Sequence, residues 1–597
     1  LLTILCVLGP LISLQGDVGK VLRVVPMILI LVLGVSLVEA FLILPAHLGH
    51  SLKSIDQRRP NLFRRRFDRF IEWLRNDLLT PAVGNVLNWR YLFIGCVMGL
   101  FLVSVGMLRG GVLKFQAFPD LDGDVVMARL LLPPGTPLAR TEETIEQITS
   151  ALEQVNEHFR PRQPEQQDLV RSVVVEYNKN TDAFEIGPHV ATVSVELLSA
   201  EVRDARIDDI IQIWRKETGP LADLVSLLFT EPTLGPAGRP IEIRVRGHDL
   251  MQLSTAADEI KTWLRQFPGV YNLVSDLRSG KPELRLRLRE GAYGMGLDAA
   301  AMSQQLRAAF QGMLADEIQV GSESYEIEVQ LQPNDQNTLA DLEYFHFTLP
   351  SGEQVPLSTM AIIEEGMGWS RIARVDGRRT VTVRGELDTR LANTVNLLAR
   401  MHKEFVPDLK QRHPGVTLMF EGEIKEAGTT QQSMVRSLLV GLIGVFVLLS
   451  FQFRSYFEPF AVMMAIPLAL IGVIWGHLLF GIDLSMPSTL GFVSLSGIVV
   501  NDSLLLVLVL KKRRQEGCEV LEACRQASQL RFRAIMLTSL TTIAGLLPLL
   551  AEKSLQAQIL IPLAVSIASG LLASTVLVLF VVPCLYAILD DFGFTAH

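Results

Sequence analysis

Cysteine is absent from the long polar stretch between Gly110 and Gln432. The five cysteines of the chain all lie outside it, at Cys6, Cys96, Cys518, Cys524 and Cys584. No disulfide bond can therefore form within this stretch, and a hydrophobic core has to stabilise its fold.

The sequence also lacks the short motifs of an enzyme. It has no phosphate-cradling Gly-Lys-Ser/Thr loop, so nothing supports ATP-driven transport. It has no nucleophile motif of an esterase or a protease. Histidine and cysteine form no constellation that would indicate a structural or catalytic metal. We therefore predict a protein that is not an enzyme and needs no cofactor.

Long apolar runs are abundant, and 49% of the residues are hydrophobic. A helix needs roughly 20 largely apolar residues to cross about 30 Å of hydrocarbon. Runs near or above that length lie at Val24–Ala46, Tyr91–Leu108, Met434–Phe453, Phe460–Phe480, Ser488–Leu510, Ala534–Leu550 and Ile559–Leu589. Leu1–Leu14 is too short to cross and lacks the basic flank of a signal peptide. We interpret it as a truncated span and the chain as the C-terminal part of a longer protein.

Lysine and arginine in short loops set the orientation, because they are retained on the cytoplasmic side. The first basic loop holds Lys53, Arg58, Arg59, Arg64, Arg65, Arg66, Arg69 and Arg75. The second holds Lys511, Lys512, Arg513, Arg514, Arg525, Arg531 and Arg533. Counting spans from either loop places Gly110–Gln432 outside the cytoplasm. The two loops therefore give the same orientation, which a wrong number of spans would prevent.

The outer stretch contains two cycles of strands and helices. The first comprises Val125–Leu132, a helix at Pro137–Phe159, Ser172–Tyr177, Val190–Leu198 and a helix at Ile207–Glu217. The second comprises Ile241–Arg246, a helix to Phe267, Tyr271–Val274, Arg371–Leu387, a helix at Thr394–Phe405 and Val416–Phe420. Each cycle is typical of a ferredoxin-like split βαβ unit. The interruption, roughly Glu283–Trp369, indicates an inserted subdomain with strands at Leu284–Leu288 and Tyr325–Leu331.

Three segments carry a resemblance to a known family. They are Ser455-Tyr-Phe-Glu458-Pro459, Gly497-Ile-Val-Val-Asn501-Asp502 and Arg531-Phe-Arg533-Ala-Ile-Met-Leu-Thr538-Ser539-Leu. In this order and spacing the chain resembles the C-terminal half of a resistance-nodulation-cell-division (RND) efflux permease of the hydrophobe/amphiphile (multidrug) type. The resemblance covers essentially the whole chain.

The resemblance implies a membrane α-helical bundle with an α+β periplasmic domain. The expected parts are the end of the fifth span and the sixth (1–48), a cytoplasmic basic amphipathic helix (49–89), the seventh span (90–109), a first porter subdomain (110–238), a second porter subdomain (239–282 and 370–432), a docking subdomain (283–369), the eighth to twelfth spans (433–590) and a cytoplasmic tail (591–597).

The resemblance also implies proton-driven export from the inner membrane of a Gram-negative cell. The expected partners are two further copies in a homotrimer, a periplasmic membrane-fusion adaptor and an outer-membrane channel. The expected substrates are small amphiphilic molecules such as drugs and detergents. Acids that drive such relatives lie on the fourth span, which this chain does not include.

One span departs from the drug-exporting relatives. Their tenth-span lysine is replaced by Asn501, and Asp502 follows where asparagine is usual. An ionised carboxylate inside a span costs several kcal/mol unless it is paired or wet. We therefore predict that Asp502 handles protons, and the alternative is a neutral carboxyl group hydrogen-bonded to a neighbouring helix.

Other candidates for the proton path lie on two spans. Thr538, with Thr541, Thr542 and Gly545, forms a stripe along one helix face that would meet Asp502. Thr538 and Arg531 match family positions associated with the path. Close helix packing is the alternative for the threonines, and a positive-inside anchor is the alternative for Arg531. Glu39 is embedded near the cytoplasmic end of its span, where contact with water would also explain it.

Candidate substrate contacts are apolar and aromatic side chains of the outer domain. They are Phe115, Phe118, Phe184 and Phe229, each of which also fits a core position. Export of a heavy-metal cation is the alternative within the family, although the methionines of the outer domain are scattered. A non-transporting membrane receptor or assembly factor is the alternative from another class, and the embedded Asp502 argues against it.

The first basic loop also contains apolar residues at helical spacing, including Phe67, Phe70, Ile71 and Leu74. A helix of this kind lies in the membrane interface, so we expect it to contact membrane lipids. The flanking spans argue against nucleic acid as the partner of its arginines.

Overall fold

The structure is a computed structural model that describes residues 2–55, 62–119, 121–232, 236–332 and 339–595. Arg58 and Arg59 of the first basic loop lie outside the described residues, as do the side chains of Lys53, Phe63 and Arg64. The chain divides into two compact units. The first comprises residues 1–132, 137–276 and 373–597, and the second comprises 133–136 and 277–372.

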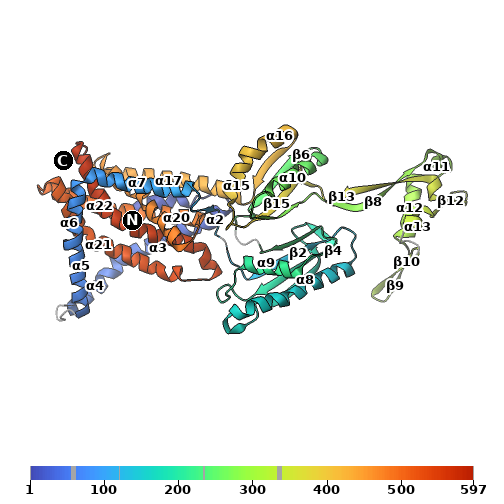
Figure 1. Ribbon diagram of the computed structural model, residues 1–597, viewed down its shortest axis with the longest axis horizontal. Helices are drawn as coiled ribbons and strands as arrows, with labels where there is room; N and C mark the ends of the chain where they lie inside the picture. The colour runs from blue at the N-terminus through green and yellow to red at the C-terminus, as the bar shows by residue number, and fades with distance from the viewer. Residues whose placement is uncertain (1, 56–61, 120, 233–235, 333–338, 596–597) are drawn as a thin grey trace. The chain divides into compact units, whose positions relative to one another are not determined.

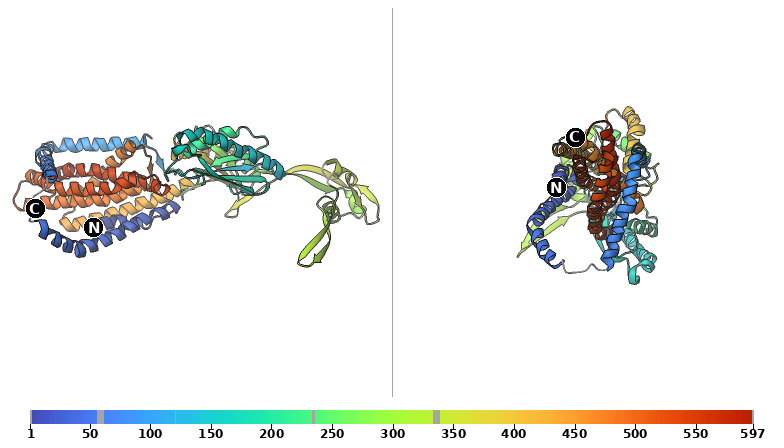
Figure 2. Two further views of the ribbon diagram at one scale, coloured as in Figure 1. Left: turned by 90° about the horizontal axis from the view of Figure 1, so that it is seen from below. Right: turned by 90° about the vertical axis from the view of Figure 1, so that its left-hand side faces the viewer.

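Within the described residues, seven helices are long and apolar enough to cross a membrane. They span Asp17–Gly49, Arg90–Arg109 (α7), Glu423–Phe453 (α17), Glu458–Phe480, Met486–Gln515 (α20), Val520–Leu550 (α21) and Leu555–Asp591 (α22). Each contains one of the seven long apolar runs of the sequence. Neighbouring long helices run side by side, as Figures 1 and 2 show. These helices make the chain a multi-pass membrane protein.

The first short helix, α1 (Leu2–Leu11), packs against α17 and α20. Glycines make this close approach possible. A Cβ atom added at Gly441 would lie 3.0 Å from the carbonyl oxygen of Cys6, and one added at Gly497 would lie 3.1 Å from the Cα atom of Ile4. Small residues at such crossings let helix backbones come together in a membrane.

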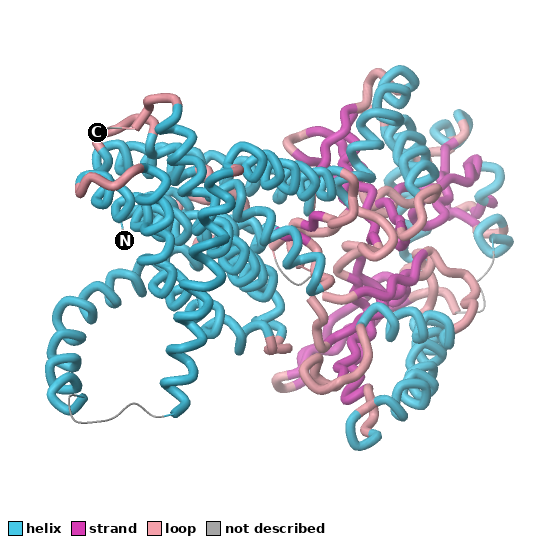
Figure 3. The backbone as a smooth tube through the Cα atoms, turned by 60° about the vertical axis from the view of Figure 1, so that its left-hand side comes forward, coloured by secondary structure: helices cyan, strands magenta, loops and turns pink. Residues whose placement is uncertain are grey.

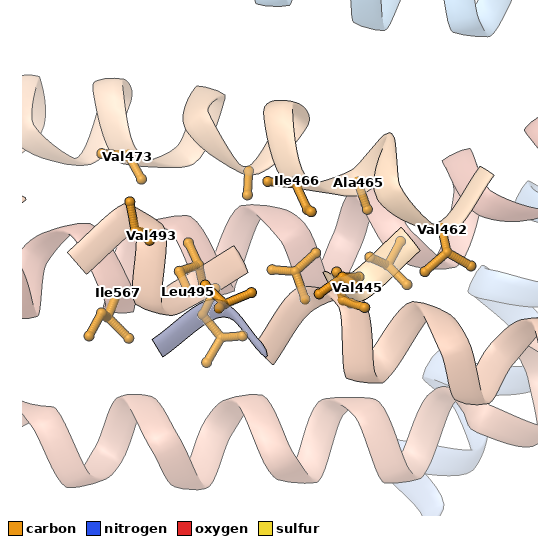
Figure 4. Close-up of a cluster of buried hydrophobic side chains, with 14 of the residues drawn as sticks. Val445, Val462, Ala465, Ile466, Val473, Val493, Leu495 and Ile567 are labelled. Atoms are coloured by element: carbon orange, nitrogen blue, oxygen red, sulfur yellow. The ribbon is translucent and has the colours of Figure 1, made fainter. Parts of the chain in front are cut away.

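The centre of the helical bundle is formed by α19 (Ala465–Phe480), α20 and α22. Figure 4 shows its buried side chains, among them Val473, Val493 and Ile567. By contrast, α3 (Val24–Val38) and α21 bury little of their surface in the described chain. Their apolar faces are therefore open to lipid or to protein outside this chain.

The first compact unit also contains two larger β-sheets, whose strands are drawn in magenta in Figure 3. Its first sheet layer contains β2 (Val125–Leu131), α8 (Leu138–Phe159), β3 (Val170–Asn180), β4 (Glu185–Leu197), α9 (Ile207–Thr218) and β5 (Ser226–Thr230). The four strands pair in the order β3-β4-β2-β5, and every pair is antiparallel. The core centres on Trp214, whose indole N–H donates to the carbonyl oxygen of Ile148 at 2.9 Å.

The second sheet layer contains β6 (Ile241–Gly247), α10 (Leu250–Leu264), β7 (Val270–Ser275), β14 (Ala373–Val375), β15 (Arg378–Leu387), α15 (Thr394–Arg400), α16 (Val406–Arg412) and β16 (Thr417–Glu421). Its strands pair in the order β14-β15-β6-β16, and β7 also pairs with β15. Along β6, Ile241, Ile243 and Val245 are fully buried and alternate with half-buried residues, as expected for a strand with one face on the core.

The second compact unit contains a long ribbon of β8 (Ser279–Leu288) and β13 (Ala361–Trp369). Its small core surrounds Phe347 and Met360, packed by α12 (Ala299–Phe310). It also carries a hairpin of β9 (Met313–Val320) and β10 (Glu323–Val329) whose residues are all exposed. The sequence predicted strands inside β8 and overlapping β10, but it did not predict β9 or β13. The unit limits of 277–372 lie slightly outside the predicted 283–369.

The first basic loop of the sequence contains α5 (Leu62–Trp73) followed by a π-helical turn at Leu74–Leu79. Phe67, Phe70 and Trp73 are about half exposed beside exposed arginines, while Ile71 and Leu74 pack against the bundle core. This mixture of exposed aromatic and basic side chains fits a helix at a lipid surface.

Candidate functional site

A cavity of about 240 Å³ lies in the first compact unit, where the two sheet layers meet the ends of the membrane helices. Its walls come from residues far apart in sequence: Lys114–Gln116, Phe118, Pro119, Leu121, Asp122, Arg206–Asp208, Ile211, Thr230–Pro232, Ala237–Pro240, Tyr271, Glu386–Thr389, Ala392–Thr394 and Glu423. The short strand β1 (Phe115–Gln116) forms part of one wall and pairs in parallel with β17 (Leu484–Ser485), immediately before α20. This pairing ties the cavity wall to the membrane bundle.

Two of the four predicted aromatic contacts line the cavity. Phe115 and Phe118 do so, together with Tyr271. Phe229 is 2% exposed and packs edge-on against Trp214 at a centroid distance of 4.9 Å, within the core of the first layer. Phe184 lies on a loop outside the cavity lining. Contact of any of these side chains with a substrate stays a prediction.

Charged side chains of the cavity are mostly acidic. The lining includes six carboxylates at Asp122, Asp208, Glu231, Glu386, Asp388 and Glu423, against three cations at Lys114, Arg206 and Arg239. The sequence analysis did not single out any of these carboxylates. No local motif marks them, because they become neighbours only when the two layers come together.

Burial raises the pKa of the Glu386 carboxyl, and Glu231 is a second cavity carboxyl with a raised pKa. Burial, followed by the nearby charges of Asp122 and Asp208, raises its pKa to about 8. The positive charge of Arg203 lowers the pKa of Glu231, but only in part. The Arg203 side chain is fully buried, and its guanidinium lies 2.6 Å from a carboxylate oxygen of Asp122. Glu231 therefore holds a proton at neutral pH.

Other cavity charges are fixed by their partners. A hydrogen bond from Arg390 lowers the pKa of Asp388, and the two side chains form an ion pair at 2.9 Å. The Lys114 ammonium donates to the carbonyl oxygens of Thr389 and Arg390, each at 2.7 Å. These contacts fix Asp388 and Lys114 in the cavity wall.

The second candidate region is the middle of α20. Asp502 is 7% exposed there, and no cation lies within ion-pair distance of its carboxylate among the described residues. Asn501, beside it, is half-buried. Proton handling by Asp502, with Asn501 beside it in place of the relatives' lysine, stays a prediction.

The structure does not bring the other predicted residues of the proton path into contact with Asp502. Thr538 is exposed on α21, and its hydroxyl donates to the carbonyl oxygen of Ile535 at 2.9 Å. Glu39 is exposed at the start of a π-helical turn, Glu39–Ile43. Arg531 is half-buried, with a buried Nε atom that has no hydrogen-bond partner among the described atoms. The threonine face of α21 is left uncovered by the described chain.

One buried ion pair of the bundle was not predicted. Glu458, fully buried at the start of α18 (Glu458–Met463), accepts a hydrogen bond from the Lys511 ammonium on α20 at 2.7 Å. The same ammonium donates to the carbonyl oxygen of Phe453 at 2.9 Å. No local pattern reveals this pair, because Glu458 and Lys511 lie 53 positions apart in the sequence.

Among the described residues, no group of three or more His, Cys, Asp or Glu side chains could hold a metal ion.

Comparison with known proteins places these observations in a wider setting. The model of a family described as the AcrB/AcrD/AcrF family matches residues 1–590. A solved structure of a heavy metal efflux pump is similar in fold, with a TM-score of 0.71 and 21% sequence identity. The similarity covers 86% of this chain and 52% of that one, so the chain spans about half the length of the pump it matches.

Proposed function

The chain belongs to the AcrB/AcrD/AcrF family of RND permeases, and on that premise we propose that it forms the C-terminal half of a proton-driven efflux permease. Members of this family are transporters rather than enzymes. The proposal places the strand-rich region in the periplasm of a Gram-negative cell. It includes assembly as a homotrimer with a periplasmic adaptor and an outer-membrane channel.

The sheet layers support two porter subdomains built as split βαβ units. In the first layer the elements follow the order β2-α8-β3-β4-α9-β5, and β2 lies between β4 and β5 in the sheet. This is the order of a ferredoxin-like unit. We assign residues 283–369 to a docking subdomain inserted in the second of these units.

The cavity carries the proposal for the substrate. Phe115, Phe118 and Tyr271 supply apolar and aromatic surface, while carboxylates outnumber cations in the lining. Aromatic faces and anionic groups together favour an organic cation with apolar parts. We therefore assign small cationic amphiphiles as the exported compounds.

Export of heavy-metal cations is the second candidate, and the fold of a heavy metal efflux pump favours it. At 21% identity this likeness concerns the fold alone. Cells expressing the protein distinguish the two: tolerance of a cationic dye or detergent supports the first candidate, and tolerance of copper, silver or zinc salts supports the second.

Asp502 carries the proposal for energy coupling, because it is buried within α20 and has no ion-pair partner among the residues that the structure describes. The test is efflux of a fluorescent cationic amphiphile after the proton gradient is imposed. We expect Asp502→Asn to lower the rate by about 100-fold or more, since an amide cannot exchange the proton. Glu519→Gln, at an exposed site before α21, is the matched control. Unchanged efflux in a correctly inserted D502N protein would refute proton handling, and no efflux even from the wild type would favour a receptor.

A further inference from the structure

A short loop of the first sheet layer reaches the second layer. Residues 181–184 connect β3 to β4, and the base of the loop is fixed to its own sheet. The Asn180 side chain, 3% exposed, donates to the carbonyl oxygen of Leu130 at 3.0 Å and accepts from the backbone N–H of Ala183 at 3.0 Å. The loop is therefore a rigid extension of the first layer.

A chain of alternating charges begins at this loop and ends in the second layer. Asp182 pairs with Arg129 of its own layer and with Arg239 at 2.7 Å. Arg239, just before β6, also pairs with Glu386 of β15 at 3.0 Å. These four side chains are only 10–19% exposed, so water screens the interactions weakly.

The tip of the loop makes a second contact with the same layer. The Arg384 guanidinium lies over the Phe184 ring, 5.0 Å from its centroid. Phe184 has a φ of 55°, a left-handed conformation that costs energy for a residue other than glycine. Such strain persists only where surrounding contacts hold it, and the loop's contacts with Arg239 and Arg384 are of that kind.

We propose that residues 181–184 are a clasp that holds the two sheet layers together and has to release for the layers to separate. Arg239 and Glu386, which the clasp holds through Asp182, also line the cavity, so the clasp is connected to the cavity wall. Asp182 is the central member, because it contacts guanidinium groups from both layers. The inference rests on these contacts and does not depend on which compound is exported.

Distances between spin labels measured by electron paramagnetic resonance test the clasp in the protein reconstituted in nanodiscs. Labels at Glu157→Cys on α8 and Asp258→Cys on α10 occupy exposed sites, one in each layer. The five native cysteines are replaced by serine. We expect Asp182→Asn to add a second population at longer distance.

Asp168→Asn is the matched control, because its ion pair with Arg160 at 2.5 Å stays within the first layer. It should leave the wild-type distance distribution unchanged. Arg239→Gln removes the opposite partner and should reproduce the longer population, which covers the case in which D182N fails to fold. The clasp would be overturned if D182N and R239Q both fold and both give the wild-type distance distribution. If D182N does not fold, a wild-type distribution for R239Q alone would overturn it.

Discussion

Two buried carboxylates of the sheet layers, Asp182 and Glu386, have guanidinium partners, whereas Asp502 in the middle of the membrane bundle has none among the described residues. The Arg239 guanidinium lies 2.7 Å from the Asp182 carboxylate and 3.0 Å from that of Glu386, and Asp182 also pairs with Arg129. Asp502 has no such partner among the described residues, although it is comparably buried. A paired carboxylate fixes the distance between two elements, whereas an unpaired one leaves its charge free to change. The difference separates groups that hold the fold from groups suited to proton exchange.

The bundle itself contains both kinds. Glu458 is paired with Lys511 near one end of α20, and Asp502 lies unpaired within the same helix. The two acids therefore offer a direct comparison inside one apolar environment.

The largest effect on stability is expected from breaking the paired group. Lys511→Met leaves the Glu458 carboxylate buried without its cation, which costs about 3–5 kcal/mol. Thermal unfolding in detergent should show this loss, and Lys512→Met, at an exposed neighbour, should not. The double variant E458Q/K511M should recover much of the stability. Equal losses in the single and double variants would contradict a direct pair.

Glu231 is a carboxyl group of the sheet layers whose charge, like that proposed for Asp502, can change near neutral pH. Burial and acidic neighbours raise its pKa from 4.5 to about 8. Between these values the folded state holds a proton that the unfolded state has lost, so stability falls as pH rises. Glu231→Gln should remove this contribution, on the order of a few kcal/mol between pH 5 and 8. Unfolding measured across that range should give a flatter curve for E231Q, while exposed Glu157→Gln keeps the wild-type slope.

The smallest effect is expected where a pair is exposed. Arg160 and Asp168 lie 2.5 Å apart, but each is about half exposed. Arg160→Gln should therefore change the free energy of unfolding by about 1 kcal/mol or less. A loss as large as that of K511M would show that burial does not decide the strength of these pairs.

The helices of the membrane region could be predicted from the sequence because a span is a local pattern. Each long apolar run maps onto one helix, and the charged loops mark its ends. Strands of the sheet layers followed in part from alternation, as in β2 and β6. β5 was missed because its five residues alternate too briefly, and β13 because Glu364, Glu365 and two glycines interrupt its apolar pattern.

The candidate site was less accessible to such reasoning. Asp502 was recognisable alone, because a carboxylate within an apolar run is unusual. The cavity could not be recognised from the sequence, because Asp122, Glu231 and Glu386 belong to three separate segments with no shared motif. The predicted contact of Thr538 with Asp502 assumed that the threonine face of α21 turns toward the face of α20 that carries Asp502. Helical periodicity fixes which residues share a face but not where that face points.

The exposed hairpin of β9 and β10 has a practical consequence for anyone handling this protein. Ile318 and Val320 share one side of the ribbon with Tyr325 and Ile327, and both outer edges lack a neighbouring strand among the described residues. Such edges are templates for intermolecular pairing, which charged side chains oppose. The hairpin carries acids and no lysine or arginine, so its copies repel one another. High salt screens that repulsion, and purified protein should self-associate more readily in concentrated buffer than in dilute buffer.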